Sequence, residues 1–186
     1  MSYARLSGDS VTQESAGGIR AFVLENAVVD GRFAKYVGSR SVDANLMWLA
    51  VPFGMFGLDD LTMLNTLCEV ERRLLSQNGV QRYPEDTYYG GGRWVLLSAW
   101  LGLCYVELGR IDEAGAIAAW IEEQADERGF LPEQVPVELN APEYYAPWAT
   151  RWGPIARPLL WSHAMYLALR HALAAGRVGS PAFSSA

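Results

Sequence analysis

Three acidic side chains in non-helical segments are the candidates for catalytic chemistry in this sequence. Glu85 and Asp86 lie in RYPEDTYYGGGR, and Glu133 lies in FLPEQ, shortly after Gly129. Apolar residues flank Glu133 on both sides, so its carboxylate is expected to be partly desolvated. Desolvation raises the pKa of a carboxylic acid and makes its anion a better base at neutral pH. A loop glutamate is more often a solvated surface group, which is the alternative interpretation of Glu133 on residue type alone.

Other kinds of reactive site have less support. His163 and His171 have no nearby Cys or carboxylate at metal-ligand spacing, and His163 is expected to be hydrogen-bonded in the core instead. The run from Gly90 to Gly92 lacks the Lys and Ser or Thr of a phosphate-binding loop, so these glycines are expected to permit the close approach of a helix or ligand. No Ser lies in a nucleophile-elbow pattern. No metal and no cofactor are therefore expected, which leaves carboxylate chemistry or no chemistry.

Composition and charge limit which binding partners and which cellular compartment are expected. The chain has 186 residues, enough for one compact domain, and a net charge of −6 with Lys and Arg scattered singly. No basic stripe is available, so no nucleic-acid partner is expected. The first twenty residues hold no signal-peptide core and no stretch reaches membrane-spanning length, which predicts a soluble, cytoplasmic protein without a membrane partner. Cys68 and Cys104 lie in apolar helical patterns and are expected to be buried thiols.

Helical periodicity dominates the chain, and no strand pattern rises above background. Six segments show it: about Gln13 to Val28, an N-cap at Ser41 followed by ANLMWLAVPFGMF, Asp59-Asp60 to Asn78, WVLLSAWLGLCYVELG, about Ile111 to Glu127, and about Pro158 to Ala175. Residues 130–157 are expected to form one long, aromatic-rich functional loop, and residues 177–186 a frayed tail. The predicted fold class is all-α, built as consecutive antiparallel helical hairpins.

Three blocks of the sequence share a recognisable order and spacing. The first block, RYPEDTYYGGGRW, runs from Arg82 to Trp94, the second is GFLPEQ with Glu133, and the third is RPLLWSHA with Trp161. Together they resemble the glucoamylase family of inverting glycoside hydrolases, which includes the glucodextranases. Their order and spacing agree with the family. The resemblance implies half of an (α/α)6 barrel, so that the whole chain would be a single partial domain forming the C-terminal part of the catalytic barrel.

The resemblance also implies roles for individual residues. Glu133 would be the general base that activates water while glucose is released, with inversion, from the non-reducing end of an α-glucoside or α-glucan. Arg82 would hydrogen-bond the hydroxyls of the reacting glucose, and Tyr88 and Trp94 would line the neighbouring sugar site. The positions assigned to substrate binding are Arg82, Glu85, Tyr88, Trp94 and Trp161.

The chain departs from the family pattern in two places. The family usually has Asn-Gly-Asn-Pro where this chain has Gly90 to Gly92 and Arg93, so the outer sugar site is expected to differ. The family's general acid belongs to an upstream Trp-Glu block, and this sequence contains no Trp-Glu pair. Half a barrel would also expose the apolar surface of its inner helices. The expected partner is therefore the missing N-terminal half of the barrel or a self-associated copy, and the chain alone is expected to be inactive.

Two non-catalytic alternatives remain open on the sequence. SAWLGLCYVELGRIDEAG, residues 98–115, also fits a tetratricopeptide pattern, which would make the protein a helical binding module. A repeat protein needs at least about three such copies, and only one is found. A degenerate barrel half that has lost activity is the second alternative.

Overall fold

The computed structural model describes residues 10–178, and helices form most of that part of the chain. The α-helices are α2 (Ser10–Asn26), α3 (Leu61–Leu74), α4 (Val95–Glu107), α5 (Ile111–Glu123), α6 (Tyr145–Trp152) and α7 (Leu160–Ala175). The 3-10 helices are η1 (Ala44–Leu49), η2 (Tyr88–Gly90) and η3 (Pro142–Tyr144). The mostly α-helical class predicted from the sequence is confirmed.

Short antiparallel strands link these helices, so the prediction that the chain has no strands was wrong. One pair is β1 (Val28–Val29) with β2 (Arg32–Phe33); the larger sheet has the order β3 (Leu75–Ser76), β4 (Gly79–Gln81), β5 (Arg93–Trp94), β6 (Gln134–Val135). Each strand contains only two or three residues. Such strands are too short to show the alternation by which a strand is recognised in a sequence.

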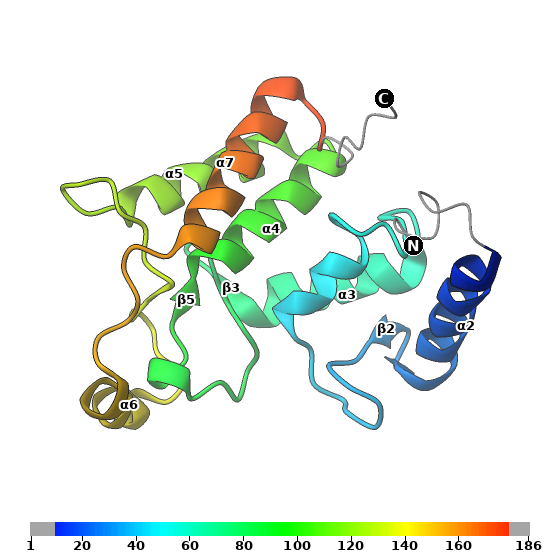
Figure 1. The fold of residues 1–186 in the computed structure, drawn as a ribbon, viewed down its shortest axis with the longest axis horizontal. Coiled ribbons are helices and arrows are strands. Elements are labelled where there is room, and N and C mark those ends of the chain that lie inside the picture. The colour runs from blue at the N-terminus through cyan, green and yellow to red at the C-terminus, as the bar shows by residue number, and fades with distance from the viewer. Residues whose placement is uncertain (1–9, 179–186) are drawn as a thin grey trace.

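Helix α4 is the centre of the hydrophobic core, as its apolar pattern predicts. Every residue from Val95 to Val106 is buried. Helices α4, α5 and α7 lie side by side, with α2 at the opposite end of the molecule (Figure 1). A Cβ at Gly102 would lie 2.8 Å from a methyl group of Leu169, so the glycine permits α4 and α7 to cross closely. Within the described residues, no helix is both long and apolar enough to span a membrane.

Two predicted helices differ from the observed ones because local side chains redirect the backbone. The segment expected to be a helix after Ser41 is the short 3-10 helix η1, and its N-cap is Asp43, whose carboxylate accepts a hydrogen bond from Asn45 N. Helix α3 begins after the Asp60 N-cap, as predicted, but ends at Leu74 instead of about residue 78. The residues that follow it form the β3–β4 hairpin, whose turn has two positive-φ residues, Gln77 and Asn78.

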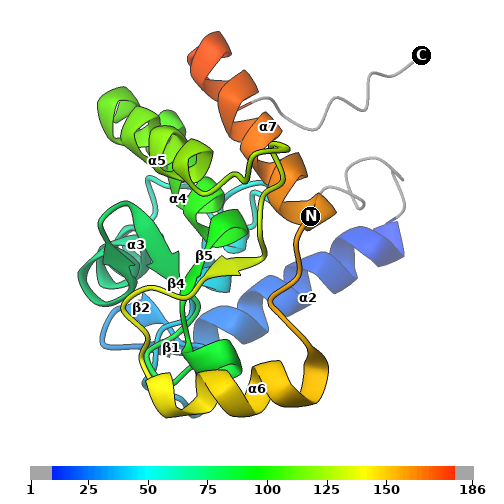
Figure 2. The same cartoon turned by 90° about the vertical axis from the view of Figure 1, so that its left-hand side faces the viewer.

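Three further predictions, on segment 130–157, on the two cysteines and on the C-terminal segment, differ in how the structure bears on them. The long segment 130–157 is not wholly a loop, because α6 forms within it and packs against η2 (Figure 2). Cys104 is buried, as predicted, but Cys68 is exposed, since it lies on the solvent-facing side of α3. In the predicted tail, Val178 N donates to Glu107. Residues 179–186 lie outside the described residues.

Candidate functional site

The four-stranded sheet brings the first two sequence blocks together. Arg82 directly follows β4, and Trp94 lies on β5, where it pairs with Val80 on one side and Gln134 on the other. Glu133 immediately precedes β6, and its carbonyl accepts a hydrogen bond from the residue after Trp94 at 3.2 Å. Positions about fifty residues apart in the chain thereby become neighbours through backbone pairing.

Arg82 is held by a bidentate ion pair with a buried carboxylate. Its Nε and Nη2 donate to the two oxygens of Asp86 at 3.0 and 2.6 Å. The Asp86 side chain is fully buried, and its Oδ1 also accepts from Tyr88 N at 3.0 Å. The guanidinium carbon lies 4.9 Å from the centre of the Trp94 ring. The hydrogen bonds of this guanidinium among the described residues use Nε and Nη2, the latter also donating to the Tyr83 hydroxyl at 3.5 Å, which leaves Nη1 able to donate to a ligand.

Glu133 is half-buried and contacts one phenol. The Tyr88 hydroxyl donates to Glu133 Oε2 at 3.1 Å. Burial raises the pKa of Glu133 above its ordinary value, while the Tyr88 hydrogen bond and the positive charge of Arg82 partly oppose that rise. Burial and the adjacent Glu133 charge raise the pKa of Tyr88 to about 12, so this hydroxyl remains a hydrogen-bond donor at neutral pH. The carboxylate is therefore partly desolvated, oriented by the Tyr88 hydroxyl and close enough to Arg82 to be influenced by its positive charge.

Gln134 organises the loop that carries Tyr88, a role that the sequence reasoning missed. Its Oε1 accepts from Gly92 N at 3.0 Å, and its Nε2 donates to the Tyr88 carbonyl at 3.3 Å. The side chain is buried. A buried amide with both ends hydrogen-bonded fixes the position of the groups it joins. The signal available in the sequence was a Gln within an otherwise apolar stretch beside Glu133.

The start of α7 anchors the segment that leads to Glu133. Ser162 Oγ donates to the Pro132 carbonyl at 2.7 Å, and Leu131 N donates to His163 Nε2 at 3.0 Å. The hydrogen bond at His163 confirms the prediction that this side chain is hydrogen-bonded in the fold. Among residues 10–178, no cluster of three or more His, Cys, Asp or Glu side chains could hold a metal ion. Residues of the third block, RPLLWSHA, thus hold the segment GFLPEQ in position through these hydrogen bonds.

Two predicted substrate-binding residues do not join this set. The Glu85 carboxylate is exposed and accepts from Ser41 Oγ at 3.0 Å. Trp161, on α7, belongs to a separate aromatic cluster, with its ring 5.7 Å from those of both Trp48 and Trp100. The structure therefore groups Arg82, Tyr88, Trp94 and Glu133, together with Asp86 and Gln134.

The glycine run permits close backbone approach, as the sequence predicts. A Cβ at Gly91 would lie 2.2 Å from the Asp86 carbonyl oxygen, and one at Gly92 would lie 2.3 Å from the Val135 carbonyl oxygen. The segment that leads to α6 is also joined to this run, because Ala141 N donates to the Gly90 carbonyl at 3.0 Å. The glycines therefore let the loop fold tightly around Asp86.

Gly91→Ala is expected to destabilise the protein more than Gly109→Ala. Both glycines have nearly the same positive φ, +73° and +72°, but nothing lies within 4 Å of a Cβ at Gly109. The left-handed backbone alone costs an alanine about 1–2 kcal/mol. The clash with Asp86 adds about 1–3 kcal/mol at Gly91. Urea unfolding of both variants measures the difference, and equal losses would contradict the close approach.

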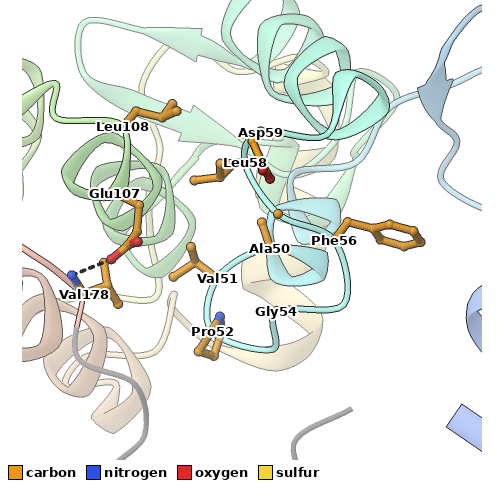
Figure 3. Close-up of a pocket in the computed structure, with 11 residues that line it drawn as sticks. Ala50, Val51, Pro52, Gly54, Phe56, Leu58, Asp59, Glu107, Leu108 and Val178 are labelled. Carbon is orange, nitrogen blue, oxygen red and sulfur yellow. Dashed lines mark hydrogen bonds between the residues drawn. The ribbon is translucent and has the colours of Figure 1, made fainter. Parts of the chain in front are cut away.

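A cavity of about 480 Å³ has a different lining, which Figure 3 draws. Its walls come from the segment after η1, the C-terminal end of α4 and Val178. Glu107 Oε1, in this wall, accepts from Val178 N at 2.7 Å. None of the grouped residues lines it. The cavity therefore offers no additional support for the proposed chemistry.

Comparison with known proteins identifies the chain's relatives, although no protein-family model matches it. It is 46% identical over 162 residues to an isomaltose glucohydrolase of Kribbella flavida, covering 86% of this chain and 42% of that protein. A solved glycosidase variant in complex with glucose superimposes with a TM-score of 0.87 at 43% identity, over 89% of this chain and 44% of the other. A bacterial glucoamylase complexed with acarbose matches with a TM-score of 0.61 at 26% identity, over 77% and 22%.

These matches favour the glycoside hydrolase interpretation over the tetratricopeptide alternative. The chain spans less than half the length of the relatives it matches. The similarity extends over 86% of the chain in sequence and 89% in fold. By sequence and fold the chain therefore corresponds to part of a glucoamylase-like glycoside hydrolase of the (α/α)6 barrel type.

Proposed function

We propose that this chain supplies the general base and part of the sugar site of an inverting α-glucosidase. The supporting observation is the half-buried Glu133 carboxylate, which accepts from the Tyr88 hydroxyl at 3.1 Å. In the proposed reaction Glu133 takes a proton from water, and the water oxygen attacks the anomeric carbon on the face opposite the leaving group. The glucose released is then the β-anomer.

Arg82 and Trp94 would hold the reacting glucose beside this base. The ion pair with Asp86 fixes the guanidinium plane and directs Nη1 away from that carboxylate, so that Nη1 can donate to a sugar hydroxyl. The Trp94 ring, stacked 5.7 Å from the Tyr88 ring at an interplanar angle of 27°, provides an adjoining apolar wall. An α-linked glucose is the proposed substrate unit, since one relative is named for isomaltose and another structure contains glucose.

The general acid of the proposed reaction comes from outside this chain. It would stand about 6.5–9.5 Å from Glu133, leaving room for the attacking water. The proposed source is the N-terminal half of the barrel, with a self-associated copy of the chain as the alternative. The exposed apolar residues of α7 support a missing neighbour: Leu160 and Leu167 are 83% and 64% exposed.

Reconstitution tests this proposal. The chain is mixed with the N-terminal half of the isomaltose glucohydrolase, and glucose release from isomaltose is followed by proton NMR. The expected result is no release by either piece alone and β-glucose as the first product of the mixture. α-Glucose as the first product would contradict inversion, and full activity of the chain alone would contradict the need for a partner.

Tyr88→Phe is expected to move the acidic limb of the pH–rate profile to higher pH. The Tyr88 hydrogen bond lowers the pKa of Glu133, so removing the hydroxyl raises that pKa. A general base works in its ionised form, and the rate falls as the pH drops through its pKa. The matched control is Tyr166→Phe, which removes a hydroxyl bound to the exposed Glu122 and should leave the limb in place. If the acidic limb of the pH–rate profile is unchanged in Tyr88→Phe, the proposed effect of the Tyr88 hydrogen bond on Glu133 is contradicted.

A further inference from the structure

An aromatic groove of about 400 Å³ opens on α6, outside the group of residues described above. Its walls are Tyr144, Pro147, Trp148, Arg151 and Trp152. The Trp152 side chain is 63% exposed and Tyr144 is 45% exposed. Exposed apolar patches mark interaction sites, and ligand-binding pockets are concave and lined mainly by apolar and aromatic side chains. The groove therefore has the lining of a ligand-binding site.

The groove is built on a firmly held segment. Buried Tyr89 donates from its hydroxyl to the Gly153 carbonyl, at the C-terminal end of α6, at 2.9 Å. Tyr89 adopts a φ of +45°, a conformation that non-glycine residues rarely tolerate without a compensating interaction. At the other end, Asn140 and Ala141 donate backbone hydrogen bonds to the glycine run. A preorganised surface loses little entropy when a ligand binds.

The groove adjoins the proposed general base through a single aromatic side chain. Trp148, one of its walls, lies edge-on to Tyr88 with ring centres 4.9 Å apart. The Tyr88 hydroxyl in turn donates to Glu133. A ligand in the groove would therefore lie beside the residues proposed to hold the reacting glucose.

The chemistry of the lining fits a sugar ring. One face of a glucopyranose presents C–H groups that can stack on indole and phenol rings, while its hydroxyls need hydrogen-bond partners. In the groove, the rings of Trp152 and Tyr144 are available for stacking against the sugar C–H groups. Arg151 provides hydrogen-bond partners for the hydroxyls: its guanidinium carbon lies over the Trp152 ring, 5.0 Å from the ring centre, so its N–H groups are held next to the aromatic surface.

We propose that the α6 groove binds a glucose unit of an α-glucan chain, outside the position of the reacting glucose. This inference rests on the proposed function for its substrate class. The groove would hold oligosaccharides more tightly than a disaccharide, because only a longer chain can occupy both positions. It extends the proposed role of the chain from cleaving a single linkage to retaining an oligomeric substrate.

Indole NMR on the full chain tests the proposal without requiring turnover. The ¹⁵N-labelled chain is titrated with maltoheptaose and with isomaltotriose, and each indole N–H signal is identified from its Trp→Phe variant. The signals of Trp148 and Trp152 are expected to shift, and Trp152→Ala is expected to weaken binding at least about tenfold. Trp152→Phe should retain part of the affinity. Phe22→Ala, which removes an exposed aromatic side chain from α2, is the matched control and should bind normally.

Several results would overturn the proposal. Unshifted Trp152 signals at millimolar sugar would do so, as would a Trp152→Ala variant that binds like the unchanged chain while its circular dichroism shows a native fold. If the indole N–H signals of Trp148 and Trp152 shift on dilution of the protein without sugar, the groove is occupied by a second copy of the chain. If adding the N-terminal half abolishes sugar binding, the groove is occupied by that half. Glu133→Gln should leave groove binding intact, so a failure of the catalytic assignment and a failure of the groove give different results.

Discussion

Glu133→Gln in the reconstituted enzyme is expected to lower kcat for isomaltose by about 10²–10⁴-fold, the contribution of a positioned general base. Glutamine keeps the size of the side chain and an oxygen that can accept the Tyr88 hydrogen bond, but it cannot take a proton from water. The fold and the KM are expected to change little. Initial rates, together with thermal unfolding of the variant, measure the effect.

The control for this change is Glu127→Gln, an exposed carboxylate in the turn before the same segment, which should leave the rate unchanged. Glu133→Ala gives a sharper test, because it opens space for a small anion that needs no base. Azide added to this variant is expected to restore cleavage and to form β-glucosyl azide, with the leaving sugar protonated by the general acid. Normal turnover in Glu133→Gln would contradict the assignment.

Arg82→Ala is expected to reduce both stability and sugar binding. It leaves the fully buried Asp86 carboxylate without its cationic partner, which costs about 3–5 kcal/mol for a buried pair. It also removes the Nη1 donor proposed for the substrate, weakening binding by about 1.5–3 kcal/mol. Urea unfolding measures the first effect and glucose titration the second.

A double variant separates the two effects. Arg82→Ala combined with Asp86→Asn removes the unpaired charge, while the Asn oxygen can still accept from Tyr88 N. Stability is expected to recover in large part, and sugar binding is not. Recovery of both would mean that Arg82 serves only the fold, and recovery of neither would mean that the ion pair is not the source of the stability loss.

Local patterns in the sequence predicted the long helices. The apolar run of α4 and the Asp60 cap of α3 are interactions among residues a few positions apart, so composition and spacing determine them. A longer helix than the 3-10 helix η1 was expected after Ser41, and helix α6 was not anticipated. Helix α6 packs against η2, a segment far away in the chain, and such tertiary packing can override local sequence preferences.

For the candidate site, the sequence supplied the residue types and the structure supplied their grouping. Arg82, Tyr88, Trp94 and Glu133 were singled out by their blocks, and the structure places these four together. Gln134 was not singled out, because a buried amide gains its role only from the partners it meets. Glu85 was singled out, but its carboxylate is directed to Ser41.

What the sequence by itself determined is the helical class, the central position of α4 and the presence of a carboxylate in an apolar setting. Only the tertiary structure decided which side chains meet. The β4–β5–β6 pairing joins Arg82, Trp94 and Glu133 through strands of two or three residues, whose stability comes from partners far away in the chain. Hydrogen bonds between such distant segments depend on the folded core that brings them together, and no local pattern encodes them.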